Sequence, residues 1–260
     1  MTAPLLTWLF VPADRPDRFE KAIASRAHAV IVDLEDGVPA GRKADARQHV
    51  MALLAAPREK LVFVRVNAGD DDDLAAVAPL PLAGVVVPKV ERPEDVPDLP
   101  VHAMIETPRG VEAAFEIASH PSVRGIALGE ADLRSHTGAL EDGLDWARGR
   151  IVNAAVAAGL PRPPQSVYMN VRDLEGLARS CRRGRELGHL GRQAIHPDQL
   201  ELIEQAYLPT QAEVDQARAT VALLADDAVG IVGDGTFVDA ALLGAAQMTL
   251  ALADAYGVAS

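Results

Sequence analysis

The sequence has a single cysteine, 4% aromatic residues and a deficit of positive charge. The lone Cys181 excludes an internal disulfide and is typical of a reducing compartment. With 25 lysines and arginines against 37 aspartates and glutamates, the net charge of −12 argues against a protein that follows nucleic-acid phosphates. No apolar run approaches the roughly 18 residues that span a bilayer, and residues 1–10 lack the basic lead and cleavage site of a signal peptide. We therefore expect a cytoplasmic protein with no nucleic-acid and no membrane partner.

The apolar content is sufficient for a large core. A chain that is 49% hydrophobic and 24% charged belongs with globular proteins rather than disordered ones. Its 260 residues suit either two small domains or one barrel of alternating strands and helices, which typically needs about 250 residues.

Short β-branched runs recur along the chain, and most are followed by a stretch with helical spacing. Most runs are continuously apolar, as expected of parallel strands buried on both faces. Eight strands are predicted, over 6–11, 29–34, 61–66, 84–89, 101–105, 125–128, 166–169 and 193–195. Helices are predicted over 18–25, 42–55, 111–119, 144–158, 172–187 and 199–207, while the segments after Leu74 and Pro93 are too short for helices. Eight βα units favour an α/β fold with a closed (β/α)8 TIM barrel over residues 1–208, rather than a doubly wound open sheet.

The pattern changes after Tyr207. Two further helices, predicted over 211–225 and 239–256, flank a turn-rich stretch, 232–237, in which Asp234-Gly235 is typical of a tight hairpin turn. Residues 209–260 are therefore predicted to form a C-terminal helical extension. The four aspartates at 70–73 lack the spacing of a calcium loop and are expected to form a solvated loop.

Charged residues follow the predicted strands, at the edge of a parallel barrel where chemistry takes place. Crowded carboxylates repel one another unless they are paired, protonated or bound to a cation. Oxygen ligands without a cysteine cluster or a histidine pair indicate Mg²⁺ or Mn²⁺ rather than zinc. Glu106 and Asp132 lie about one βα unit apart, so we expect them at neighbouring strand tips. The charged residues at these ends are Asp33, Glu35, Asp36, Arg65, Lys89, Glu106, Glu130, Asp132 and His196.

Each of these residues also has a structural interpretation. A carboxylate at a strand end can cap the next helix or pair with a base. Arg65 suits a substrate carboxylate or an enolate, or alternatively an ion pair with the acids at 33–36. Lys89 is a candidate Schiff-base nucleophile, although the nearby acids would keep it protonated. His196 is either a general base or a loop cap, and Cys181 is expected to be a buried helix residue rather than a catalytic thiol.

Motifs along most of the chain resemble those of the citrate lyase β-subunit-like family, within the superfamily of malyl-CoA lyases and class II pyruvate aldolases. Asp33-Leu34-Glu35-Asp36, Glu106-Thr107-x-x-Gly110 and Ile195-His196-Pro197 are jointly specific in this order. The resemblance implies a (β/α)8 barrel that binds Mg²⁺ through Glu106 and Asp132, with Arg65 as the arginine that binds the keto acid. It also implies a homo-oligomer, either a trimer or a hexamer.

In this family the C-terminal segment covers the site and contributes an aspartate in a Gly-x-Met-Ile-Asp pattern. The corresponding stretch here is Gly235-Thr236-Phe237-Val238-Asp239, so the resemblance implies Asp239 as the acid/base, with Glu35 or Asp36 as alternatives. The chain departs from the family in the 129–133 loop, which reads Gly-Glu-Ala-Asp-Leu instead of Gly-Ala-Glu-Asp-Leu. It also carries Gln165 where many members have an aspartate.

The implied reaction cleaves or forms a carbon–carbon bond next to a thioester. Substrates such as citryl-CoA or malyl-CoA would yield a 2-oxo acid, oxaloacetate or glyoxylate, together with an acetyl thioester. Two other functions stay open: a class II aldolase that releases pyruvate without a thioester, and a partner subunit that binds a keto acid without turnover. The expected substrate-binding residues are Arg65, Glu106 and Lys89, with Arg15, Arg18 and Arg192 as candidates for the coenzyme A phosphates.

Overall fold

The computed structural model describes residues 3–226, 229–231 and 235–258. These residues form two compact units, Leu5–Ala206 and a second unit that contains the chain from Tyr207 onward. No helix in the described ranges is long and apolar enough to cross a membrane.

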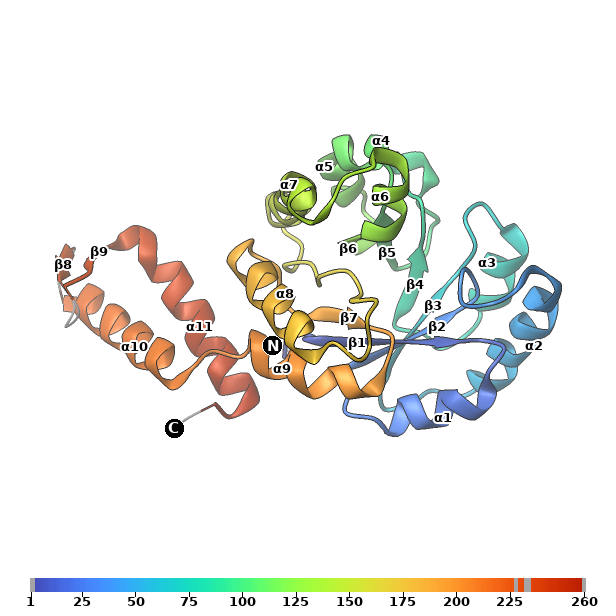
Figure 1. Cartoon of the computed structure of the whole chain (residues 1–260), viewed down its shortest axis with the longest axis horizontal. Coiled ribbons are helices and arrows are strands. Elements are labelled where there is room, and N and C mark those ends of the chain that lie inside the picture. Colours follow the sequence, from blue (N-terminus) through green and yellow to red (C-terminus); the bar gives the residue numbers. More distant parts are fainter. Residues whose placement is uncertain (1–2, 227–228, 232–234, 259–260) are drawn as a thin grey trace. The chain divides into compact units, whose positions relative to one another are not determined.

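The larger unit is built on a parallel sheet that curls into a half-barrel (Figure 1). Its seven strands have the order β6-β5-β4-β3-β2-β1-β7, so strands consecutive in the sequence are neighbours except at β7. All pairings are parallel, as the continuously apolar runs predict. The strands are β1 (Thr7–Pro12), β2 (Ala29–Asp33), β3 (Leu61–Arg65), β4 (Gly84–Val87), β5 (Val101–Ile105), β6 (Val123–Leu128) and β7 (Arg192–Ala194).

The strand predicted over 166–169 is wrong. Gln165 alone forms an isolated parallel bridge, to Arg192 of β7, and residues 166–169 are not a strand. The preceding prolines, Pro161, Pro163 and Pro164, lack the N–H groups that a strand ladder requires. The resulting half-barrel confirms an α/β fold and is compatible with the predicted (β/α)8 barrel.

Helices connect the strands and cover the outside of the sheet (Figure 1). The predicted helix over 111–119 is interrupted at Ala113, and the 129–133 segment, expected to be a loop, begins helix α6. The helices of this unit are α1 (Pro16–Ala24), α2 (Lys43–Leu53), α3 (Asp71–Val77), α4 (Pro108–Glu112), α5 (Ala114–Ala118), α6 (Glu130–Thr137), α7 (Asp145–Ala157), α8 (Leu174–Glu186) and α9 (Leu200–Tyr207).

The acidic run at 70–73 is not the solvated loop that we expected. Asp70 caps α3 by accepting a hydrogen bond from the main-chain N–H of Asp73. Asp73 is fully buried and lies 2.8 Å from Nε of Arg47. Acidic side chains are favoured in the first turn of a helix because its N–H groups have no partner within the helix.

Aromatic side chains fill the interior of the half-barrel. The rings of Trp8, Phe63 and His102 have centroids 4.9 to 5.0 Å apart. Trp8 and Phe63 pack with Ile31 and Met104 in one buried cluster. This cluster fills part of the interior, and the cavity described below lies at the carboxyl ends of the strands.

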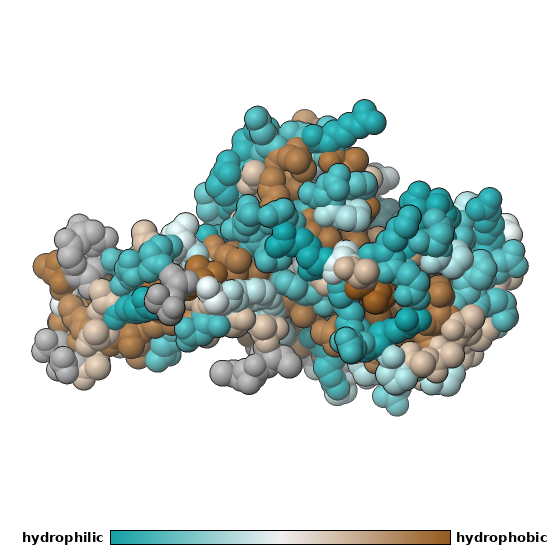
Figure 2. Space-filling view, turned by 90° about the horizontal axis from the view of Figure 1, so that it is seen from below, coloured by the Kyte–Doolittle hydropathy of each residue, from teal (hydrophilic) through white to brown (hydrophobic). Residues whose placement is uncertain are grey.

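The second unit consists of two helices and a small hairpin. α10 (Gln211–Asp226) packs against α11 (Leu243–Tyr256), which begins later than the predicted residue 239 because Asp239 ends a strand. β8 (Val229–Ile231) pairs antiparallel with β9 (Phe237–Asp239), and the predicted turn at Asp234 lies outside the described residues. Apolar side chains such as Ile231 and Phe237 are exposed, and Figure 2 shows apolar patches on this unit.

Buried histidines such as His189 make the stability of the larger unit dependent on pH. His189 is 1% exposed, and its Nε2 has no hydrogen-bond partner among the described residues. Burial lowers the pKa of His189 from 6.5 to about 4. The unfolded chain therefore binds a proton that the folded chain does not bind between about pH 6.5 and pH 4, so the free energy of unfolding falls as the pH falls through this range.

We expect His189→Gln to remove its own share of this loss, about 2.5 kcal/mol at pH 4.5, while His102, whose pKa burial also lowers to about 4, keeps its share. Urea unfolding at pH 7.5 and pH 4.5 measures the difference for wild type and variant. His136→Gln, at an exposed position on α6, serves as the control and should keep the wild-type pH dependence. Equal losses in wild type and His189→Gln would contradict the assignment.

Candidate active site

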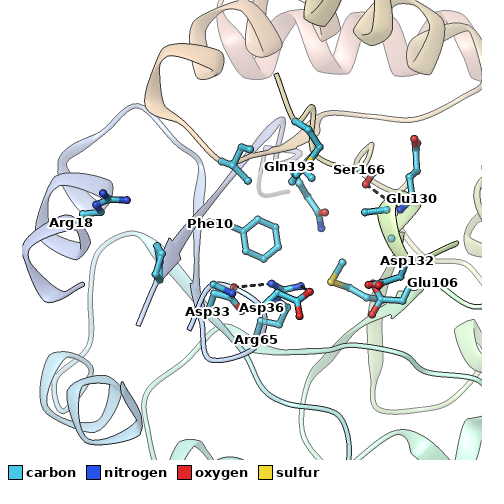
Figure 3. Close-up of a pocket in the computed structure, with 18 residues that line it drawn as sticks. Phe10, Arg18, Asp33, Asp36, Arg65, Glu106, Glu130, Asp132, Ser166 and Gln193 are labelled. Carbon is cyan, nitrogen blue, oxygen red and sulfur yellow. Dashed lines mark hydrogen bonds and ion pairs between the residues drawn. The ribbon is translucent and has the colours of Figure 1, made fainter. Parts of the chain in front are cut away.

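A cavity of about 340 Å³ lies at the carboxyl ends of the strands (Figure 3). Phe10 and Met104 contribute apolar surface to its wall. Of the site residues expected from the sequence, the cavity brings together Arg18, Asp36, Arg65, Glu106 and Asp132. The polar residues that line it are Arg18, Asp33, Asp36, Arg65, Glu106, Glu130, Asp132, Ser166 and Gln193.

The position of Glu106 follows from the pairing of β5 with β6. Ile105 pairs with Leu128, so the next residues, Glu106 and Gly129, lie side by side where the two strands end. A Cβ atom at Gly129 would lie 2.1 Å from Oε2 of Glu106. Only glycine therefore leaves space for this buried carboxylate, which is 1% exposed.

Asp132 lies in the first turn of α6, which begins directly after β6. Its carboxylate and that of Glu106 occupy the same side of the cavity in Figure 3. Burial, together with the negative charges of Glu35 and Asp132, raises the pKa of Glu106 from 4.5 to about 7. Such a shift corresponds to roughly 3 kcal/mol against the ionised form, so this part of the cavity favours a bound cation.

The other acids around the cavity already have cationic partners. Glu130 accepts two hydrogen bonds, of 2.9 and 2.7 Å, from the 2% exposed Arg148, and in Figure 3 it points away from Glu106 and Asp132. Asp33 is likewise paired with Arg65. Within the described ranges, neither Glu106 nor Asp132 forms an ion pair with a lysine or arginine side chain within 4.0 Å.

This donor set fits Mg²⁺. Oε1 of Glu106 accepts a hydrogen bond from the main-chain N–H of Lys89, at 2.8 Å, and Oε2 has no such partner among the described residues. No group of three or more His, Cys, Asp or Glu residues suited to a metal is found in the part of the chain that the structure describes. Mg²⁺ takes one or two protein carboxylates and keeps several waters, so two carboxylates are sufficient.

Arg65 lines the same cavity as the two unpaired carboxylates and is held by several contacts. Asp33 and Arg65 are register partners at the ends of β2 and β3, and their side chains form two parallel hydrogen bonds of 2.7 Å. Glu35 Oε2 lies 2.8 Å from Nη1 of Arg65, and the Phe10 ring lies 5.0 Å from the guanidinium carbon. Although burial opposes its charge, these acids raise the pKa of Arg65 further above its usual value. The ion pair weighed as an alternative role for Arg65 is confirmed, and the guanidinium also faces the cavity.

Glu35 and Lys89 lie behind this wall. Neither residue lines the cavity, although both were expected at the reaction. The ammonium group of Lys89 contacts Oε1 of Glu35. Burial lowers the pKa of Lys89, but Glu35 and Glu106 outweigh it and leave the pKa raised. The Schiff-base interpretation therefore loses its basis, because that chemistry requires a neutral amine.

Four further predictions are resolved by local contacts. Arg192 is wrong as a coenzyme A ligand, because it is 2% exposed and bonded to Gln165 and Ser180. Arg15 pairs with Asp17 on the surface.

Nδ1 of His196 accepts a hydrogen bond from the main-chain N–H of Asp198, which confirms its role as a loop cap. Cys181 is buried in α8, as expected, and burial raises its pKa.

Asp239 belongs to the second unit. Its Oδ1 accepts a hydrogen bond from the main-chain N–H of Ala241, so the aspartate caps a 3₁₀ turn formed by Ala240–Leu242.

Two polar residues that line the cavity, Gln193 and Ser166, were not predicted from the sequence. Gln193 on β7 is 4% exposed, and its amide projects into the cavity in Figure 3. The Ser166 hydroxyl accepts a weak hydrogen bond, 3.3 Å, from the main-chain N–H of Glu130. The register pairs Gln193 with Trp8, an inward-facing residue, so a polar residue in a short buried strand was the available signal.

The arrangement places two carboxylates and a fixed guanidinium in one cavity, together with the apolar side chains of Phe10 and Met104. Such a site suits a small anionic substrate rich in oxygen atoms. Charges interact more strongly in a partly apolar cavity than in bulk water, because the dielectric constant is lower there.

Comparison with known proteins identifies close relatives of this chain. A (3S)-malyl-CoA thioesterase of Cereibacter sphaeroides is 35% identical, over 97% of this chain and 95% of the relative. A citrate lyase subunit beta-like protein of Mycobacterium tuberculosis is 35% identical, over 94% of this chain and 93% of the relative.

Solved structures agree with this relationship. The M. tuberculosis CitE protein in complex with magnesium, acetoacetate and coenzyme A superposes with a TM-score of 0.87, at 32% identity, over 98% of this chain and 100% of that chain. A citrate lyase beta subunit from the same organism, complexed with oxaloacetate and magnesium, has a TM-score of 0.72 at 35% identity, over 80% of this chain and 98% of that chain. The HpcH/HpaI aldolase/citrate lyase model matches residues 6–100 and 96–197. The chain therefore belongs to the HpcH/HpaI aldolase/citrate lyase family.

Proposed function

We propose that this chain is an Mg²⁺-dependent lyase that breaks or forms a carbon–carbon bond between a 2-oxo acid and an acyl thioester. The observation that carries the proposal is the pair of unpaired carboxylates, Glu106 and Asp132, in one cavity with Arg65. The ligands named for the M. tuberculosis structures, which are magnesium, oxaloacetate, acetoacetate and coenzyme A, support it. Malyl-CoA and citryl-CoA are the substrates that combine these two chemical parts.

The acidic and the basic residues of the cavity would have different roles in the reaction. Glu106 and Asp132 would hold Mg²⁺, which supplies electrostatic stabilisation to a keto oxygen when bound. Arg65, immobilised by Asp33, would bind the carboxylate of the keto acid or offset the charge of an enolate. Phe10 and Met104 would keep this charge away from bulk water.

In the lyase direction the substrate hydroxyl loses its proton and becomes the carbonyl of the 2-oxo acid. The carbon–carbon bond breaks, and its electron pair stays on the α-carbon of the acetyl thioester, which takes up a proton. Asp239 is the proton carrier that the family resemblance implies, with Asp36 at the cavity wall as the alternative. A closed (β/α)8 barrel, a lid formed by residues 209–260 and a trimeric or hexameric assembly belong to the same proposal.

Thioester hydrolysis is a second candidate, because a relative covering nearly the whole chain is named a (3S)-malyl-CoA thioesterase. The two reactions give different products from one substrate. A lyase converts malyl-CoA to glyoxylate and acetyl-CoA, whereas a thioesterase adds water and releases malate and a free coenzyme A thiol.

Incubation of the purified protein with malyl-CoA or citryl-CoA and Mg²⁺ tests both. We expect acetyl-CoA and a 2-oxo acid by chromatography, without a matching rise in free thiol. A rise in free thiol without acetyl-CoA would favour hydrolysis. If neither product forms while oxaloacetate and Mg²⁺ bind in calorimetry, the chain is a binding subunit and the enzymatic proposal is wrong.

Glu106→Gln should lower Mg²⁺-dependent turnover by about 10²-fold or more, since it removes one of two charged ligands with little change in size. Mn²⁺ binding, followed by electron paramagnetic resonance of the free ion, should weaken in parallel. Glu112→Gln, on the exposed side of α4, is the matched control. Wild-type turnover in Glu106→Gln would refute the metal assignment.

Gly129→Ala should act on the same site without removing a ligand. The added methyl group would overlap Oε2 of Glu106, so the buried carboxylate must move, and we expect Mn²⁺ affinity to fall by about tenfold or more. Gly149→Ala on α7, where a Cβ meets no atom within 4 Å, should bind Mn²⁺ as the wild type does. An unchanged affinity in Gly129→Ala would show that Glu106 is not a ligand in the position described.

A further inference from the structure

Lys89 has an unusual main-chain conformation next to the site. Its φ of +54° makes it the one non-glycine residue with positive φ in the described part of the chain. A residue with a Cβ atom rarely adopts the left-handed region, so the surrounding contacts must hold Lys89 there. The strained residue, Lys89, lies two positions after the end of β4, in the turn that follows this strand.

This conformation directs two groups of one residue at two different carboxylates. The main-chain N–H of Lys89 donates to Oε1 of Glu106 at 2.8 Å. The ammonium group at the far end of the same side chain contacts Oε1 of Glu35. One oxygen of Glu106 is thereby fixed, and the other is left for the cavity.

Glu35 also contacts Arg65, which lines the cavity. Its second oxygen lies 2.8 Å from Nη1 of Arg65 and has no hydrogen bond with good geometry among the described residues. Glu35 is 6% exposed, so water does not replace these two cationic neighbours. Glu106, Lys89, Glu35 and Arg65 therefore form a continuous chain of contacts from a carboxylate of the cavity to its guanidinium.

We propose that Lys89 is a positioning residue that fixes Glu106 for the divalent cation and ties it, through Glu35, to Arg65. The inference rests on the metal site of the proposed function. Lys89 does not line the cavity and does not need to touch the substrate. Groups that orient a metal ligand in this way typically account for about 10- to 100-fold in metal affinity.

A purely structural role makes a different prediction. If Lys89 served only to neutralise the buried Glu35, removal of both charges would restore both the stability of the protein and its affinity for the metal. If Lys89 positions Glu106, the double variant regains stability but not metal affinity, because the link that holds the turn is still missing.

Mn²⁺ titration at constant pH, followed by electron paramagnetic resonance, tests this on the full chain, with urea unfolding of each variant in parallel. Lys89→Met should weaken Mn²⁺ binding by about tenfold or more, and Lys89→Arg should retain most of the affinity. The double variant Lys89→Met/Glu35→Gln should regain the unfolding midpoint but remain weak in Mn²⁺ binding. Lys60→Met, at the amino end of β3, is the matched control for loss of a partly buried lysine.

The inference is overturned if Lys89→Met binds Mn²⁺ as tightly as the wild type, or if the double variant recovers affinity together with stability. The wild-type titration separates this failure from that of the proposed function. If the wild-type protein binds no Mn²⁺, both the proposed metal site and this inference are wrong. If wild type and Lys89→Met both bind Mn²⁺ tightly, only the positioning role of Lys89 is wrong.

Discussion

Among the described residues of the half-barrel, two acids at the strand ends lack the cationic partner that their neighbours have. Buried acids around the strand ends are paired with arginine, such as Asp33 with Arg65 and Glu130 with Arg148. Glu106 and Asp132 are left without such a partner among the described residues, and the raised pKa of Glu106 is the result. A protein gains nothing in stability from an uncompensated buried carboxylate. The pair is therefore best explained by a cation that comes from outside the chain.

The backbone supports this arrangement through register. Parallel pairing places the last residues of neighbouring strands side by side, so the alignment of β2 with β3 brings Asp33 to Arg65. The alignment of β5 with β6 brings Glu106 beside Gly129, where a larger residue would collide with it. The register of the strands thus fixes the positions of Asp33, Arg65 and Glu106 in the site.

Much of the fold and the centre of the site could be predicted from the sequence because apolar runs followed by charged residues mark the ends of buried parallel strands. Prediction failed where a residue's environment depends on distant partners. Arg192 looks like a surface cation in the sequence, yet Gln165 and Ser180 enclose it. Asp73 looks solvated within an acidic run, yet Arg47 pairs with it inside the unit. Neither contact leaves a periodic signal along the chain.

The altered residue order at 129–133 shows how the position of one acidic residue affects the charge of the cavity. A side chain at residue 130 opens α6 and reaches Arg148, whereas Asp132 lies farther along the same turn and lines the cavity beside Glu106. Because Arg148 neutralises Glu130, the cavity keeps two free carboxylates instead of three. Two carboxylates leave most coordination positions of Mg²⁺ to waters and substrate oxygens. With this order of residues, Glu106 and Asp132 line the cavity together, and Glu130 pairs with Arg148.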